Sequence, residues 1–144
     1  MKTCACLLLI LFACKPTTRL GDMMGVPTES SLKDTHWVAV DLGGEPLSTN
    51  IKRPYLILKS QDSMVQGFGG CNMISGNYET SGKKLTFGQL ISTKMFCEDA
   101  KDLEPHFLML LGEVTGFSIR EHELTLLAGD KILAHFRSEG VAKN

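Results

Sequence analysis

The sequence predicts a mainly β domain with one helix (α+β), a small antiparallel curled sheet or barrel of about eight strands whose helix closes one end. Three observations support this fold class. From Thr35 onward, apolar or alternating runs of strand length recur and are divided by turn residues. The last three runs are joined by connections so short that hairpins, and therefore antiparallel pairing, are required. One segment instead has apolar residues at helical spacing.

The expected strands follow one another with turn residues between them. Pro54 can stand only at the start or edge of a strand, which places it before the run at 55–58. The alternation of Ile132, Ala134 and Phe136 predicts that these side chains share one face and that His135 points outward. The expected strands cover residues 37–40, 55–58, 64–68, 74–78, 85–87, 117–119, 124–126 and 132–136.

A helix is expected over residues 99–114. Asp99, Asp102 and Glu104 crowd its start, where carboxylates meet the positive end of the helix dipole. These side chains are expected to be solvated, because the spaced ligands of a calcium loop are missing. Pro105 is tolerated in the first turn, where its missing N–H has no acceptor. The apolar residues at helical spacing are Leu103, Phe107, Leu110, Leu111 and Val114.

The composition limits what the chain can do. It has 144 residues, of which 43% are hydrophobic and 22% are charged, so it can form the packed core of one domain. The formal net charge of −1 gives no basic excess for a run of phosphates, which argues against a nucleic-acid partner. No apolar run reaches the roughly eighteen residues that a membrane-spanning helix needs.

Residues 1–13 have the pattern of a secretory signal peptide, with an early Lys and a short apolar stretch. The stretch ends in Leu-Phe-Ala before Cys14, which resembles the bacterial lipobox, in which the Cys becomes the acylated first residue. Lipidation is favoured because a free thiol at an exported N-terminus would be reactive. Residues 14–33 then form a lipidated N-terminus and a flexible tether. The alternatives are ordinary export with an incidental Cys14 and a cytosolic chain with an apolar start.

These features predict an exported protein of the bacterial cell envelope that is anchored in the membrane by the acyl groups, such as palmitate, on Cys14. Lys15 follows the acylated residue and favours the outer membrane over retention at the inner one. Whether the body faces the periplasm or the cell surface does not follow from these residues.

The most specific part of the chain combines glycines, an asparagine and two cysteines. Residues 67–72 read Gly-Phe-Gly-Gly-Cys-Asn, residues 75–78 read Ser-Gly-Asn-Tyr, and residues 93–97 read Thr-Lys-Met-Phe-Cys. In order and spacing they resemble the META domain family, which includes the heat-inducible bacterial lipoprotein HslJ. The resemblance assigns residues 34–138 to one META domain and leaves a tail at 139–144. The residues of the family motif are Gly67, Gly70, Asn72, Gly76, Thr93 and Met95.

The resemblance implies a small, mostly antiparallel β structure with one helix, often on a secreted or lipid-anchored chain. It implies no established catalytic reaction, and it points to no cofactor. Members of the family are associated with stress response, drug tolerance or surface exposure. Met73 stands where a basic residue often follows Cys-Asn, so a polar role of that position is not carried over.

The residue types of the motif favour a structural role over a ligand site. Gly67, Gly69 and Gly70 permit left-handed or bulged backbone and let chains approach closely. Asn72 can bond neighbouring backbone groups in a bend. A Gly-rich ligand loop is the alternative, but no helix follows it to hold a phosphate. Thr93 is expected to face solvent or to cap local backbone, because a nucleophile needs a positioned base.

Cys71 and Cys97 are predicted to form a disulfide, because two thiols in an oxidising space normally pair. Buried free thiols, a metal pair and a thiol nucleophile are the alternatives. Zinc would need two further ligands, and no histidine stands near either cysteine in the sequence, so no metal site is predicted. The histidines expected to be ordinary surface or strand residues are His36, His106, His122 and His135.

Together these observations predict a membrane-anchored envelope lipoprotein whose META domain is not an enzyme and serves as a binding or stress-protective module. Its partners would be the membrane, through the lipid anchor, and an unknown protein or small apolar ligand. The alternatives are an envelope enzyme with a site built from loops and a purely structural or assembly lipoprotein. An open apolar cavity in the folded body would favour binding inside it, whereas a filled core would leave the surface as the place for a site.

Overall fold

The computed structural model describes residues 31–141. The predicted signal peptide at 1–13, Cys14 and residues 15–30 of the predicted tether lie outside the described residues. The elements are β1 (Thr35–Leu42), β2 (Glu45–Pro46), β3 (Tyr55–Leu58), β4 (Met64–Phe68), β5 (Met73–Ser81), β6 (Lys84–Phe87), β7 (Ile91–Ser92), the short 3-10 helix η2 (Glu98–Ala100), α1 (Leu103–Glu113), β8 (Gly116–Arg120), β9 (Glu123–Ala128) and β10 (Lys131–Val141).

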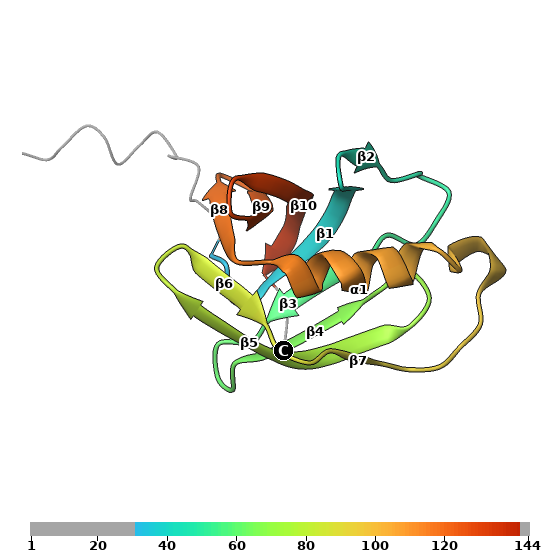
Figure 1. The fold of residues 1–144 in the computed structure, drawn as a ribbon, viewed down its shortest axis with the longest axis horizontal. Helices are drawn as coiled ribbons and strands as arrows, with labels where there is room; N and C mark the ends of the chain where they lie inside the picture. The colour runs from blue at the N-terminus through green and yellow to red at the C-terminus, as the bar shows by residue number, and fades with distance from the viewer. Residues whose placement is uncertain (1–30, 142–144) are drawn as a thin grey trace, which may run out of the picture.

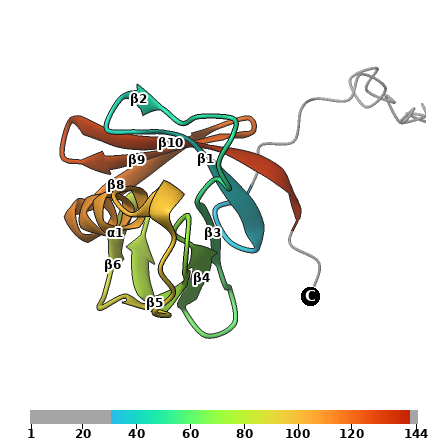
Figure 2. The same cartoon turned by 90° about the vertical axis from the view of Figure 1, so that its right-hand side faces the viewer.

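The strands form an antiparallel barrel, which confirms the predicted fold class (Figure 1). Around the barrel the order is β1, β3, β4, β5, β6, β8, β9 and β10, and β10 pairs with β1 to close it. The two-residue strands β2 and β7 add to β1 and β5. Figure 2 shows α1 lying between the β8–β10 side of the barrel and the strands β5 and β6, so that the helix closes an end of the core.

The helix begins later than the sequence analysis predicted. Residues 98–100 form the separate 3-10 turn η2, and α1 starts at Leu103 rather than at Asp99. The reason is Pro105, whose ring would collide with the carbonyl four residues earlier if the helix extended through it. Starting at Leu103 places Pro105 within the first turn, where the prediction required it to be.

Large side chains fill the interior of the barrel. Trp37 from β1, Phe107 from α1 and Phe136 from β10 are fully buried, and the rings of Phe107 and Phe136 lie 6.2 Å apart. Tyr78 is buried as well and donates its hydroxyl to the Lys59 carbonyl at 2.8 Å, and burial raises the pKa of this phenol. The centre of the domain is therefore a packed core and not a ligand chamber.

The alternation predicted for β10 is wrong at its start. Ile132 is 48% exposed, while Leu133 and Ala134 are both buried. The pairing of β10 with β9 shifts register between Ile132 and Ala134, which is a β-bulge. The extra residue lets two neighbouring side chains enter the core and turns Ile132 outward. Beyond the bulge the alternation holds, and His135 lies on the outer face as predicted.

Candidate functional site

The family motif forms a buried polar network around Asn72, which is only 6% exposed. Its side-chain oxygen accepts hydrogen bonds from the Met95 amide at 2.7 Å and from the Thr93 hydroxyl at 2.9 Å. Its side-chain nitrogen donates to the Met95 carbonyl at 3.2 Å and to a carboxylate oxygen of Glu104 at 3.1 Å. Asn72 thus links the residue before β5 to the segment after β7 and to α1.

Glu104 is a correction to the sequence analysis, which expected a solvated carboxylate at the start of the helix. The side chain is buried because Oε2 accepts the Asn72 backbone N–H at 2.7 Å while Oε1 accepts the Asn72 side-chain amide. Hydrogen bonds to both oxygens replace the water that the carboxylate gives up. Asp99 and Asp102, by contrast, are exposed as expected.

The predicted disulfide between Cys71 and Cys97 is present, with the two Cα atoms 5.8 Å apart. It links the start of the motif to the residue before η2, next to the network around Asn72. Thr93 is exposed, and its hydroxyl donates to the Asn72 side-chain oxygen and accepts the Met73 backbone N–H at 3.3 Å. The backbone of the loop between β7 and η2 is therefore held inward, while the Met95 and Phe96 side chains are exposed.

The motif glycines have two different roles. Gly70 has a φ of +112°, a conformation that side chains disfavour. Gly67 and Gly76 instead permit close approach, because a Cβ on Gly67 would lie 2.3 Å from the Tyr55 carbonyl oxygen and one on Gly76 would lie 2.7 Å from the Gln89 carbonyl oxygen. Both neighbours are backbone atoms, which cannot rotate away as a flexible side chain could.

Gly67→Ala is expected to lower the free energy of unfolding by about 2 kcal/mol or more, because the barrel wall must move to admit the methyl group. The matched control is Gly112→Ala in α1, where a Cβ meets no atom within 4 Å, and there a gain of roughly 0.5–1 kcal/mol is expected. Urea denaturation of both variants measures the difference. Equal stabilities would show that Gly67 is not required for close approach.

The first hollow on the barrel surface, here called the aromatic groove, lies outside β1, β3 and β4 and has a volume of about 530 Å³. A row of rings crosses it. The His36 and Tyr55 rings meet edge-on with centroids 4.5 Å apart, and the Tyr55 and Phe68 rings stack at 6.1 Å. The other residues that line it are Val38, Lys52, Arg53, Met73 and Glu139.

The second hollow, here called the neutral groove, lies outside β4, β5 and β7 and has a volume of about 420 Å³. Met73 lines both grooves, and its sulfur lies 3.9 Å from the Tyr55 hydroxyl. The two hollows therefore meet at this side chain. None of the lining residues of the neutral groove carries a charge: they are Gln66, Met73, Ile74, Ser75, Ile91, Ser92 and Thr93.

Lys52 and Arg53 give the aromatic groove a cationic end. Neither residue forms an ion pair within residues 31–141. Lys52 is exposed and Arg53 is half-buried. Glu139 is the acidic residue of the lining, and its carboxylate lies 3.9 Å from Nδ1 of His36. A guanidinium that has no carboxylate partner in the described part of the chain can take an anion from outside.

The sequence analysis did not single out these groove residues. Tyr55 and Phe68 lie on separate strands that pair directly with each other, and each is the outward residue beside a buried neighbour. The available signal was an aromatic residue at an outward strand position, where a polar residue is usual. Strand order decides which outward residues are neighbours, and strand order cannot be read from the local sequence pattern.

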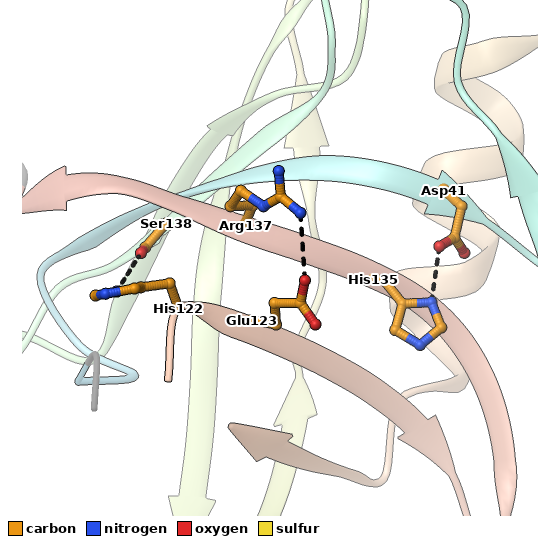
Figure 3. Close-up of polar contacts among 6 residues, drawn as sticks. All are labelled: Asp41, His122, Glu123, His135, Arg137 and Ser138. Atoms are coloured by element: carbon orange, nitrogen blue, oxygen red, sulfur yellow. Dashed lines mark hydrogen bonds and ion pairs between the residues drawn. The ribbon is translucent and has the colours of Figure 1, made fainter. Parts of the chain in front are cut away.

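A polar row on the outside of β1, β9 and β10 is a second candidate (Figure 3). The Nδ1–H group of His135 donates to Oδ2 of Asp41 at 2.7 Å, and the other oxygen of Asp41 is buried without a hydrogen-bond partner within the described part of the chain. Figure 3 shows a second, separate pair, in which Ser138 Oγ and His122 Nδ1 lie 3.4 Å apart. A carboxylate–imidazole pair and a hydroxyl–imidazole pair are thus present, but they do not form one chain of groups.

Two further features bear on the kind of protein. Within residues 31–141, no group of three or more His, Cys, Asp or Glu side chains is placed to hold a metal ion. No helix in the same part of the chain is long and apolar enough to cross a membrane.

The fold and the motif define a small helix-capped antiparallel β-barrel domain with a disulfide-linked polar network. The model of the META domain family matches residues 30–140, and the chain belongs to this family.

Two solved structures share the fold. One is the NMR structure of a protein from Burkholderia xenovorans, with a TM-score of 0.59 and 24% identity over 75% of this chain and 83% of that one. The other is also an NMR structure, with a TM-score of 0.58 and 23% identity over 79% of this chain and 96% of that one. No curated protein matches the chain.

Proposed function

We propose that this protein is an exported, lipid-anchored component of the bacterial cell envelope whose META domain is a non-catalytic binding module. The aromatic groove is its binding site. The observation that carries this proposal is the row of His36, Tyr55 and Phe68 rings on the barrel surface beside Arg53, which forms no ion pair within residues 31–141. Aromatic faces and a cation at a hollow provide contact area and orientation for a ligand.

The packed core supports a site on the outside of the barrel. Trp37, Phe107 and Phe136 occupy the interior, so a ligand cannot enter it without unfolding part of the core. The aromatic groove has the volume of a small-molecule site and is already formed. Surface binding needs no rearrangement of the barrel, which suits a domain whose walls are held by a disulfide and a polar network.

Several features favour binding over catalysis. Cys71 and Cys97 bond each other and are not available as nucleophiles. The Asp41–His135 pair has the geometry of an orienting carboxylate and a base, and it is the best support for the alternative of an enzyme. The Ser138–His122 pair is separate from it (Figure 3). A turnover by the purified protein that is lost in His135→Ala, without unfolding, would decide for an enzyme.

The anchor is part of the proposal. Acylation of Cys14 would hold the domain at the outer membrane, and the Cys71–Cys97 disulfide suits an oxidising compartment. A binding module in that place could protect the envelope under stress by sequestering a harmful compound. The alternative of a purely structural or assembly lipoprotein would apply if the groove binds nothing.

Palmitate labelling tests the anchor. Cells that produce the full chain are expected to label it, and Cys14→Ala is expected to remove the label because the acylated thiol is gone. Cys6→Ala is the matched control, since this cysteine lies within the predicted signal peptide. Label that persists in Cys14→Ala would contradict the lipoprotein assignment.

Recovery of ligands from native envelopes tests the groove. The amounts of small molecules and lipids that are extracted from the purified protein are expected to be lower for Arg53→Gln and Phe68→Ser than for the wild type. For Ile132→Ser they are expected to be unchanged. Ile132 is an exposed apolar residue of β10 that lines neither groove, so its variant controls for general stickiness. Identical extracts from all proteins would contradict a binding role for the groove.

A further inference from the structure

We infer that the two grooves together bind an anionic amphiphile, a molecule with one acidic head group and one hydrocarbon tail. This inference rests on the proposed function, because it names the ligand class of the same site. The aromatic groove and the neutral groove meet at Met73 and differ in charge, so they form a track with a cationic end and an uncharged end. An anionic amphiphile matches this track, because it has a negative head group at one end and an uncharged tail at the other.

The head group is assigned to the end formed by Lys52 and Arg53. Both residues line the aromatic groove and lack an acidic partner within residues 31–141. Arg53 is half-buried, and its guanidinium has no carboxylate partner within residues 31–141. A carboxylate or phosphate oxygen pair fits the planar fork of Arg, and Lys52 adds a second positive charge. Glu139 faces His36 instead, at 3.9 Å.

The tail is assigned to the surface that runs from Tyr55 over Phe68 to Met73 and Ile91. Tyr55 and Phe68 stack, and the Tyr55 hydroxyl touches the Met73 sulfur, so the apolar surface has no break between β3 and β5. Ile91 is 63% exposed and continues it on β7. Strands β3, β4, β5 and β7 are successive neighbours, and three spacings of roughly 4.8 Å give a track of about 14 Å.

The side chains of the track suit a flexible hydrocarbon. Met73 is half exposed and can change rotamer to fit the tail, and aromatic faces accept methylene groups without a directional requirement. The exposed apolar surface would be covered by the tail, which is the main favourable term for binding. A ligand with a charged tail end would find no partner in the neutral groove, whose lining has no charged side chain.

Binding of laurate and of three comparison probes to the full chain tests the assignment. All proteins carry Cys14→Ala, so that they stay free of acyl groups, and are exported so that the disulfide forms. The probes, each used as monomers, are lauryl maltoside and dodecyltrimethylammonium, which share the tail, and acetate, which has the head alone. Calorimetry gives affinities, and the NMR signal of the Met73 methyl group reports the site.

Laurate is expected to bind at least about tenfold more tightly than either comparison amphiphile, because a charge-assisted hydrogen bond to Arg53 is made by laurate alone among the three. The double variant Lys52→Gln with Arg53→Gln is expected to remove this preference. Met73→Glu is expected to weaken laurate binding, since it places a negative charge beside the tail. Ile132→Ser is expected to change nothing. Monolauryl phosphate distinguishes a phosphate head group from a carboxylate.

Equal affinities for the three amphiphiles would overturn the inference. An affinity for laurate that is the same in the wild type and in the groove variants would overturn it as well. Acetate binding as strong as that of laurate would show a simple anion site. Binding to phosphatidylglycerol vesicles without binding of monomeric laurate would show a bilayer-docking surface instead. If the groove variants lower the amount of ligand recovered from native envelopes while laurate does not bind, the ligand class is wrong and the proposed function stands. If neither shows binding, both fail.

Discussion

Replacing Cys71 and Cys97 together with serine is expected to lower the free energy of unfolding by about 3.5 kcal/mol, on the chain-entropy estimate for the 26 residues that separate them. The disulfide acts mainly by restricting the unfolded chain, so its removal makes unfolding more favourable even where native contacts remain. For a domain of this size the loss is a large share of the total stability.

Urea denaturation of the wild type and the double variant, each with and without reducing agent, measures this effect. The reducing agent is expected to lower the midpoint of the wild type toward that of the variant and to leave the variant unchanged. Mass spectrometry of the non-reduced protein locates the bond. A variant with the wild-type midpoint would show that the disulfide contributes nothing to folding.

Asn72→Ala is expected to lower the free energy of unfolding by about 3–5 kcal/mol, because it removes partners from several buried groups at once. Oε1 of Glu104, the amide and the carbonyl of Met95, and the Thr93 hydroxyl would each lose a hydrogen bond, whereas Oε2 of Glu104 keeps the Asn72 backbone N–H. The loss of the side chain also opens a cavity at the junction of β5 and α1.

Glu104→Gln probes the same network from the other side, with an expected loss of about 2 kcal/mol. Glutamine has one acceptor oxygen, whereas the two Asn72 donors occupy both oxygens of Glu104. The matched control is Asp102→Asn, an equal change of charge at an exposed position near the same helix start, which is expected to have little effect. If both variants lose the same stability, charge at the helix start matters rather than the network.

The network links the stability of the fold to the proposed site. Thr93 lines the neutral groove and bonds Asn72, so the groove is built on the segment that the disulfide and Asn72 hold in place. The part of the motif around Cys71 and Asn72 therefore supports the neutral groove and does not line the aromatic floor. The aromatic floor comes from β3 and β4, outside the core of the motif around Cys71 and Asn72.

Local pattern and covalent chemistry were enough to predict several features of this protein. Alternation of apolar residues placed the strands, and the spacing of Phe107 and Leu111 placed the helix, because one buried face imposes its period on the chain. Pairing of Cys71 with Cys97 was predicted because they are the two cysteines that lie outside the predicted signal peptide and lipidation site. The outward direction of His135 followed from its neighbours.

Which side chains meet across strands could be seen only in the folded chain. Glu104 has the charge of a solvated residue, and its burial depends on Asn72, 32 positions earlier in the chain. The His135–Asp41 bond joins residues 94 positions apart. The bulge that turns Ile132 outward depends on pairing with β9, and the grooves depend on the order of β1, β3, β4, β5 and β7. Local periodicity fixes the face on which a side chain lies, whereas its partners depend on strand order and register, which long-range packing decides.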